Sequence, residues 1–487
     1  MENDHNAQIF IGAGLLFLIA AALVFRFKNK LVSKHNLLQG SISKGIIGFT
    51  IPLLVGGFFQ QFYTTVDTIM LGQFVGSHAV GAIGPSGMIF FLVLSVMIGF
   101  TAGGGILIAH YFGAKDFIGL KKGIDTFYIT ILIGAIIITV VGVIITPISL
   151  RLVDLPEELV PDAEVYLRVL FLSSIFAFGY NGIASILRSI GDSITPLIFL
   201  IISTAINIVL DYIFIYLFQW GVAGAAWATV IAQAASFVMA LIYMGRQTSE
   251  HLHLHLHKLN FDKEIFKKMI KMGLPASIQQ TVISLSLVLL SKLVNRYGAS
   301  YTNAYSAIQR LDSFIILPGM NFMLTISTFV GQNIGAKQFD RLKQGLITTL
   351  LIGIGFSSIV SFIIAIDPHL FLSFFLKDDL TATLIGVEYF SVTIWFYPIA
   401  TAMFIFSGAI RGSGQAMVSM MISIFVSLVL RVPLAIFLES LLGPSGIWWS
   451  FVVTWGTGLL LNALYWMSGH WRNKSVILTS KSKLASN

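Results

Sequence analysis

Long apolar runs recur along almost the whole chain of 487 residues, and they limit its fold more than any other feature. Each run is about 20 residues long, which is the length that a helix needs to cross the hydrocarbon core of a bilayer. Short loops rich in glycine, proline and charged residues separate the runs. Charged residues make up 11% of the chain, whereas soluble domains contain about 25%. The sequence therefore predicts an all-α polytopic membrane protein.

We predict about thirteen spans, with approximate cores at 9–25, 45–70, 82–108, 124–149, 162–186, 194–218, 222–245, 268–293, 304–330, 345–366, 382–407, 415–439 and 445–467. The first run follows Glu2 and Asp4 and precedes Arg26, which reverses the charge order of a secretory signal. We therefore expect 9–25 to be a retained, extra N-terminal transmembrane helix.

Lysine and arginine are concentrated in alternate loops. If the N-terminus lies outside, the basic clusters all lie inside, at 26–44, 115–122, 246–271, 337–343 and 472–483. The intervening loop 151–162 carries four acids against one arginine. By the positive-inside rule, this pattern predicts a multi-pass protein of the cytoplasmic (inner) membrane with a cytoplasmic C-terminus. The net charge of +8 then reflects topology, and we expect no nucleic-acid partner.

The chain also carries an internal duplication. The segments GAKDFIGLKKG (113–123) and GAKQFDRLKQG (335–345) match, and other landmarks keep nearly the same offset, including Pro52 with Pro275, Arg188 with Arg411 and Trp227 with Trp449. A register held across six helices predicts two pseudo-symmetric six-helix bundles, an N-lobe and a C-lobe. Because six is even, both bundles begin on the same side of the membrane, an arrangement that transporters use for alternating access.

These features divide the chain into five segments. We predict an extra transmembrane helix with a basic cytoplasmic segment (1–40), the N-lobe (41–245), a cytoplasmic linker (246–266), the C-lobe (267–470) and a basic cytoplasmic tail (471–487). The linker contains HLHLHLH (251–257), whose imidazoles could bind a metal from one face of a strand. No carboxylate cluster accompanies them and the chain has no cysteine, so a solvated linker of biased composition is favoured.

Two carboxylates lie inside predicted N-lobe spans, where ionisable residues are costly and usually functional. Asp67 and Asp211 both fall in the outer half of the membrane by their distance along each helix. Asn207 is one turn from Asp211 on the same helix face. Thr229 and Tyr166, on two helices that run inward, lie at a similar depth. We therefore expect these five side chains to converge on one ion-coupling site.

The chemistry of this set suits either of two ions. Carboxylate, amide and hydroxyl oxygens are hard ligands, so Asp67, Asn207, Asp211 and Thr229 could hold Na⁺. Two acids in a low-dielectric site also hinder each other's ionisation, so the pair could instead carry a proton. A structural alternative is that the acids satisfy helix backbone groups or a buried arginine.

The C-lobe lacks the equivalent acids. At the repeat offset, Asp67 corresponds to Leu290 and Asp211 to Leu434, although Tyr166 does correspond to Tyr389. The polar residues in or near the C-lobe spans are mainly basic, and the possible polar site there consists of Lys292, Arg310, Arg431 and Glu388. Snorkelling of these side chains or closure of the two lobes is favoured over a role in substrate binding.

Several of these motifs, taken in order, are familiar. VDTIMLGQFVGSHAVGAIG, the GAK-x-F loops, LRSIGDS ahead of INIVLDYIF, and WGVAGAAWATVIAQ, with the arrangement repeated, resemble the multidrug and toxic compound extrusion (MATE) family over about 45–468. The resemblance implies two six-helix lobes that form a V and export cationic amphipathic compounds in exchange for H⁺ or Na⁺. It also implies that a monomer is sufficient and that no cofactor other than the coupling ion is needed.

Within the family, the chain is most similar to the DinF-like branch. That similarity implies that Asp67, Asn207 and Asp211, with Thr229 and Tyr166, form the ion site, and that Pro52 permits a bend in the first helix of the N-lobe. The sequence differs from the family in two respects. The helix at 9–25 is additional to the usual twelve, and the acid that another branch carries in the first C-lobe helix is absent from 275–292.

The sequence thus predicts a secondary active multidrug efflux antiporter. The alternative is a flippase for lipid-linked oligosaccharides or other lipids, which would need a wide basic cavity formed by residues such as Lys292, Arg310 and Arg431. Paired acids suit a cation better than a pyrophosphate. We do not expect an enzyme, because the chain has no HExxH, GxSxG or cysteine nucleophile. A channel also fits less well than a carrier, because the acid site is present in one lobe only.

Overall fold

The computed structural model describes residues 37–152, 155–249, 251–254, 258–376 and 379–472. The regular structure within these ranges is entirely helical. Twelve helical segments there are long and apolar enough to cross a membrane. The predicted all-α polytopic fold is therefore confirmed. The predicted helix at 9–25 and the basic tail beyond 472 lie outside the described residues.

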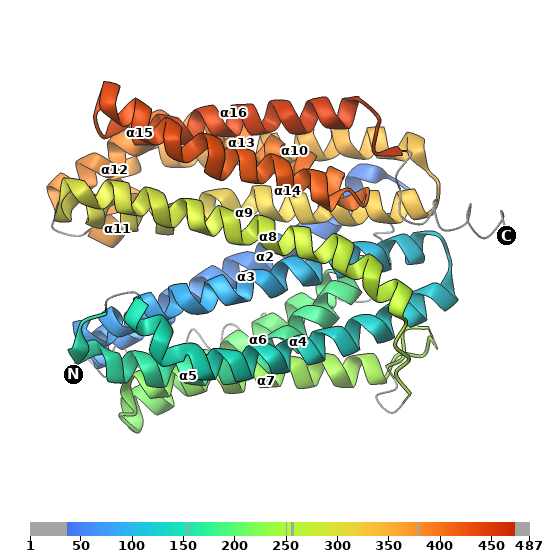
Figure 1. Ribbon diagram of the computed structural model, residues 1–487, viewed down its shortest axis with the longest axis horizontal. Coiled ribbons are helices and arrows are strands. Elements are labelled where there is room, and N and C mark those ends of the chain that lie inside the picture. Colours follow the sequence, from blue (N-terminus) through green and yellow to red (C-terminus); the bar gives the residue numbers. More distant parts are fainter. Residues whose placement is uncertain (1–36, 153–154, 250, 255–257, 377–378, 473–487) are drawn as a thin grey trace. The chain divides into compact units, whose positions relative to one another are not determined.

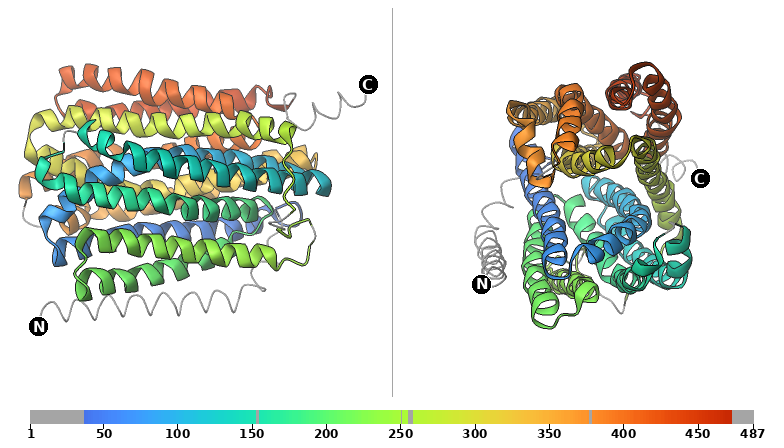
Figure 2. Two further views of the ribbon diagram at one scale, coloured as in Figure 1. Left: turned by 60° about the horizontal axis from the view of Figure 1, so that its bottom comes forward. Right: turned by 90° about the vertical axis from the view of Figure 1, so that its left-hand side faces the viewer.

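The described helices group into two compact units (Figure 1). The first unit contains Ile51–Phe112 and Asp116–Met269 and is called the N-lobe below. Its helices run alongside one another, as the views in Figure 2 also show. They are α2 (Ile42–Phe74), α3 (Ser77–Gly113), α4 (Phe117–Leu152), the 3₁₀ turn η1 (Glu157–Leu159), α5 (Val160–Ser189), α6 (Ile194–Asp211), the π-helical segment η2 (Tyr212–Leu217) and α7 (Gly221–Gly245).

The second unit, called the C-lobe, contains Leu37–Thr50, Gly113–Lys115 and residues from 270 onward. Its helices are α8 (Lys263–Val294), η3 (Asn295–Tyr297), α9 (Ala299–Gly335), α10 (Phe339–Ile366), α11 (Pro368–Leu376), α12 (Leu380–Thr393), η4 (Ile394–Phe396), α13 (Tyr397–Gly412), α14 (Ala416–Ile424), the π-helical segment η5 (Phe425–Leu430), α15 (Arg431–Leu442) and α16 (Ser445–Met467). The segments α12 to α13 and α14 to α15 each form one span.

The duplication is visible in the backbone. Lys115 and Lys337, which occupy the same place in the two GAK loops, both adopt the left-handed conformation, with φ of 52° and 59°. Gly191 and Gly414, which end equivalent helices, have φ of 98° and 86°. Residues with side chains avoid this region, so the shared values indicate the same turn geometry in both halves.

The first helix of the N-lobe begins within the C-lobe unit. Thr50 and Thr325 are joined there by a hydrogen bond of 2.8 Å between their hydroxyls. The side-chain amide of Asn333 donates to the carbonyl of Leu37 at 3.2 Å. Helix α2 then continues into the N-lobe from Ile51. This helix is therefore shared between the two units.

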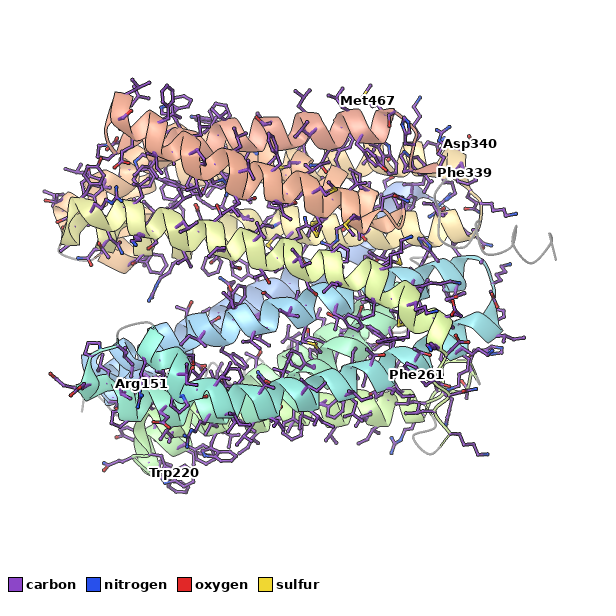
Figure 3. All side chains as sticks on the ribbon, viewed as in Figure 1. Arg151, Trp220, Phe261, Phe339, Asp340 and Met467 are labelled. Atoms are coloured by element: carbon purple, nitrogen blue, oxygen red, sulfur yellow. The ribbon has the colours of Figure 1, made fainter. Side chains whose placement is uncertain are left out.

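The residues labelled in Figure 3 mark the ends of the helix bundle in each unit. In the N-lobe, Arg151 and Trp220 lie at one end of the bundle, and Phe261 lies at the opposite end. In the C-lobe, Phe339, Asp340 and Met467 lie together at one end. The loops that the sequence assigns to one side of the membrane are thus grouped within each unit.

Large apolar side chains point outward from the spans. On α4, Ile144 is 66% exposed, and on α10, Leu351 is 70% exposed. Such side chains are stable in lipid, where there is no hydrophobic drive to bury them, and helices instead pack closely through small residues. Gly142 of α4 is one of these, because its backbone lies directly against the buried ring of Phe171 on α5.

We predict that Gly142→Ala destabilises the N-lobe. A methyl group at this position would lie 2.3 Å from Cδ1 of Phe171, and the resulting overpacking should cost about 1–3 kcal/mol. Thermal unfolding of the purified protein in detergent measures the effect. Gly355→Ala is the control, because a Cβ there meets open space. Equal unfolding temperatures for Gly142→Ala and the unmodified protein would contradict the packing described here.

Candidate ion-coupling site

Asp211 is the last residue of α6, at the point where the helix changes to the π-helical segment η2. Its side chain is fully buried, at 0% exposure. The carboxyl of Asp67, on α2, is close enough to share a hydrogen bond with it. Apart from that carboxyl, no donor among the described residues reaches Asp211 Oδ1. The structure thus brings together the two acids that the sequence singled out, from two different helices.

Asn207 lies between the two acids. It is one turn before Asp211 on α6 and is 1% exposed. With its amide nitrogen directed toward the acids, it donates to Asp211 Oδ2 at 3.2 Å and to Asp67 Oδ1 at 3.1 Å. This orientation follows from chemistry, because ionised carboxylates only accept hydrogen bonds. One side-chain amide therefore binds both carboxyls.

Tyr166 and Thr229 are placed differently around this pair. Tyr166, on α5, is close enough to Asp67 and Asp211 to interact electrostatically with both. It also packs against a buried cluster that includes Ala226 and Val230 of α7. Thr229 is buried on the same helix, and its hydroxyl donates to the carbonyl of Ala225 at 3.1 Å. Tyr166 thus borders the acid pair, whereas the hydrogen bond described for Thr229 lies within its own helix.

Pro52 lies inside α2 and is the second residue of this helix within the N-lobe. Proline has no N–H, so the carbonyl of Gly48 has no helical hydrogen bond from position 52. The helix is therefore weaker at this point than elsewhere. Asp67 lies further along the same helix.

The oxygen atoms at the acid pair supply only some of the ligands that Na⁺ requires. Asp67 and Asp211 supply carboxylates, but in the orientation of Asn207 that donates to both acids, its amide oxygen is turned away from the pair. Sodium coordination would require this amide to rotate. Among the described residues there is no group of three or more His, Cys, Asp and Glu side chains that could hold a metal ion.

Part of the histidine tract is attached to the N-lobe. The ring of His251 stacks on Phe117 with centroids 4.8 Å apart. The carbonyl of His253 accepts a hydrogen bond of 3.0 Å from Lys121. His255 and His257 lie outside the described residues. These contacts show that the start of the tract packs on α4 rather than extending freely into solvent.

The basic residues predicted for the C-lobe do not converge. Arg431 is buried, donates from Nε to Thr454 Oγ1 at 3.0 Å, and lies 4.9 Å from the centre of the Phe451 ring. Glu388 accepts a hydrogen bond from Ser445, and none of the ion pairs among the described residues joins it to Arg431.

Lys292 and Arg310 are exposed. Arg310 lines a cavity of about 460 Å³ with Asn303, Ser306 and Asp379. The described contacts therefore do not assemble the four predicted polar residues into one site.

Sequence analysis did not single out Asp312 of α9, a buried acid within a membrane span. It is 7% exposed, and it accepts hydrogen bonds from the hydroxyls of Tyr389 and Tyr397. The signal was a carboxylate within the apolar run 304–330. Its position two residues after Arg310 made that stretch resemble the polar end of a span.

Comparison with known proteins agrees with this architecture. The MatE family model matches residues 52–213 and 275–437, once in each half of the chain. The probable multidrug resistance protein YoeA of Bacillus subtilis is 32% identical over 448 residues, covering 90% of this chain and 96% of that protein. The multidrug export protein MepA of Staphylococcus saprophyticus is 25% identical, with 85% and 91% covered.

Solved structures share the fold. A multidrug resistance MATE family transporter in an outward-facing conformation superposes with a TM-score of 0.83 at 23% identity, covering 88% of this chain and 96% of that one. A MATE structure in the bent conformation gives a TM-score of 0.80 at 23% identity, with 92% and 98% covered. Together with the family match over both halves and the similarity to YoeA, this likeness leads to one conclusion: the chain belongs to the MATE family of multidrug transporters.

Proposed function

We propose that the protein is a secondary active antiporter that exports cationic amphipathic compounds in exchange for protons through Asp67, Asn207 and Asp211. The observation that carries the proposal is the single buried amide of Asn207 shared by two carboxyls from separate helices. Two negative charges that share one amide repel each other strongly, and the full burial of Asp211 increases the cost of its charge. A proton shared by the pair removes one of the charges.

Antiport follows when the proton and the drug compete for the same negative charge. The ionised pair attracts a cationic drug, because a charge buried in a transmembrane bundle is poorly screened. A proton that binds the pair cancels this attraction and favours drug release. The two ligands thus exclude each other through one electrostatic centre, without direct contact between them.

The proton is a better coupling ion than Na⁺ for this geometry. In the orientation that satisfies both acids, Asn207 presents hydrogen-bond donors, and sodium requires oxygen ligands. Tyr166 borders the pair and interacts electrostatically with both acids, so it senses a change in their charge.

The change in charge can be transmitted along α2. This helix carries Asp67 at one end and is weakened at Pro52, near the point where it leaves the C-lobe unit. A change in the attraction between Asp67 and α6 therefore acts on a helix that can bend at a defined position, Pro52. We propose that this bend couples protonation to the exposure of the drug site.

The remaining features of the proposal concern location and assembly. The loop charges favour the cytoplasmic membrane, with the N-terminus outside and the C-terminus inside. We propose a monomer as the functional unit. A lipid flippase is not favoured, because the basic residues that it would need are not assembled within the C-lobe.

We predict that Asp211→Asn abolishes proton-driven drug efflux. The amide cannot bind and release a proton, so the charge at the site no longer changes. Ethidium efflux from proteoliposomes under an imposed pH gradient should fall to the level of protein-free vesicles. Asp340→Asn, which alters an exposed acid at the start of α10, is the matched control and should retain efflux. Normal efflux by Asp211→Asn would remove this residue from the mechanism.

We predict that Asn207→Leu slows efflux about tenfold or more. The substitution preserves approximate size but removes the donor shared by the two acids. Each lost hydrogen bond to a buried charge costs about 1.5–3 kcal/mol, and about 1.4 kcal/mol corresponds to a factor of ten. Initial rates of ethidium efflux in proteoliposomes measure the effect. An unchanged rate in Asn207→Leu would show that the amide is not part of the coupling site.

A sodium gradient is the third test. Efflux from the same proteoliposomes should follow an imposed pH gradient and show no response to an imposed sodium gradient at constant pH. This result is expected because the nitrogen of Asn207 faces the acids. Efflux driven by sodium alone would mean that the amide rotates to bind the ion, and it would replace the proton in the proposal.

A further inference from the structure

A second acid lies in the membrane-spanning part of the C-lobe, on a helix that supplies nothing to the site described above. Asp312 is on α9, within the span Ala299–Gly335. Its Oδ2 accepts a hydrogen bond of 2.7 Å from Tyr389 on α12, and its Oδ1 accepts one from Tyr397 on α13. The two tyrosines are 0% and 1% exposed. Two spans of the bundle, Ala299–Gly335 and Leu380–Gly412, therefore meet at one carboxyl.

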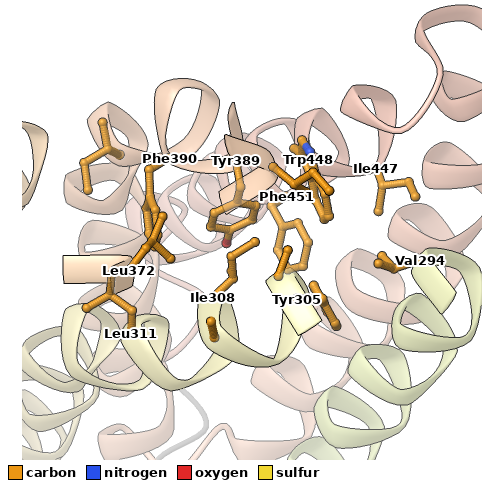
Figure 4. Packing of buried hydrophobic residues seen from close by; sticks show 14 of the residues in the cluster. Val294, Tyr305, Ile308, Leu311, Leu372, Tyr389, Phe390, Ile447, Trp448 and Phe451 are labelled. Atoms are coloured by element: carbon orange, nitrogen blue, oxygen red, sulfur yellow. The ribbon is translucent and has the colours of Figure 1, made fainter. Parts of the chain in front are cut away.

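This cluster lies in the largest apolar core described for the C-lobe. Figure 4 shows Tyr389 beside Trp448 and Phe451, facing the helix α9 that carries Tyr305 and Ile308. The rings of Tyr389 and Trp448 have centroids 5.2 Å apart. A charge or an unpaired polar group inside an apolar bundle is costly, so an acid at this position indicates a functional role.

No described Lys, Arg or His forms an ion pair with Asp312. Arg431 is the buried cation of the same core, and its guanidinium binds Thr454 and lies over Phe451. Tyr305, the other titratable group nearby, is on α9 with Asp312. The ionised carboxyl is therefore held by the two phenol donors rather than by a fixed positive charge.

The three groups can also accommodate a proton. Tyr389 and Tyr397 have their hydroxyl oxygens 3.4 Å apart. When a proton binds Asp312 Oδ1, that oxygen donates to Tyr397, Tyr397 turns its hydrogen to Tyr389, and Tyr389 continues to donate to Asp312 Oδ2. The result is a closed ring of three hydrogen bonds. Every polar group is satisfied in both protonation states, so the change leaves no buried group unpaired.

The duplication adds an independent observation. Tyr389 corresponds to Tyr166 at the repeat offset, and Tyr166 borders the acid pair of the N-lobe. Each lobe thus places a buried acid next to the same tyrosine of the repeat. The acids come from different helices, α2 and α6 in one lobe and α9 in the other.

We propose that Asp312, Tyr389 and Tyr397 form a second proton-binding centre, located in the C-lobe, which gains and loses one proton during the transport cycle. The coupling of this proton to drug export rests on the proposed function. The proton binding itself does not, because it depends only on the geometry of the three side chains.

Proton binding can be measured without transport. Infrared difference spectra of the protein in lipid, between mildly acidic and mildly alkaline pH, detect the C=O stretch of protonated carboxyls. We expect Asp312→Asn to remove one band, and Asp340→Asn to leave that band in place. If Asp312→Asn removes no pH-dependent band, Asp312 keeps one protonation state and the proposal is wrong.

Tyr397→Phe tests the same centre while retaining the acid. It removes a donor to the ionised carboxyl and opens the ring of the protonated form, so the pH at which the Asp312 band appears should shift. A band with an unchanged pH dependence would contradict the proposed ring. This variant also covers the case in which Asp312→Asn does not fold.

Whether Asp312 takes part in the transport cycle is tested by the number of protons exchanged for each drug molecule. With the membrane potential clamped at zero, the steady-state ethidium ratio rises with the imposed pH difference, and the logarithmic slope gives the number of protons exchanged per drug. We expect the slope to fall by one in Asp312→Asn. An unchanged slope would exclude Asp312 from the cycle.

The two proposals can fail separately. Normal efflux by Asp211→Asn would refute the N-lobe proposal and would leave the C-lobe centre intact.

Discussion

One interaction underlies the proposed transport mechanism: Asp67 and Asp211 share the side-chain amide of Asn207. An isolated carboxylate would be very costly in this environment, and two unpaired ones would be worse. In the proposed mechanism, the amide lowers the cost of burying the pair without neutralising it, so the charge remains available to a proton or to a cationic drug. The buried position at the end of α6 keeps water from screening that charge. A basic partner in place of the amide would stabilise the fold but would fix the charge.

The two lobes share a backbone fold because the chain is duplicated, but their buried polar side chains differ. Their loops repeat the same left-handed residues, and both halves match the same family model. The acid positions of the N-lobe are nevertheless occupied by Leu290 and Leu434 in the C-lobe. There, a carboxyl from α9 lies beside the repeated tyrosine instead. A helix bundle tolerates this exchange because its packing depends on the backbone and on small residues, whereas a polar site depends on a few side chains.

Sequence reasoning predicted the parts of the structure that depend on local patterns. The length of the apolar runs predicted the spans, and the spacing of Asn207 and Asp211 placed both on one helix face. Asp67 was found because an acid in an apolar run is conspicuous. The role of Asp312 could not be predicted in the same way, because its two tyrosine partners lie 77 and 85 residues away. The π-helical turn after Asp211 and the start of α2 within the C-lobe unit have no local signal either. Lys292 and Arg310 were grouped by charge alone, and their long side chains reach the surface instead.

The most direct test of the central claim is to let the drug drive the proton. Proteoliposomes that contain a pH-sensitive dye are given an ethidium gradient with no pH difference and no membrane potential. If drug and proton compete for Asp67 and Asp211, ethidium moving in one direction will change the internal pH by moving protons in the other, and Asp211→Asn will show neither movement. Ethidium transport with no accompanying change in internal pH would contradict the account.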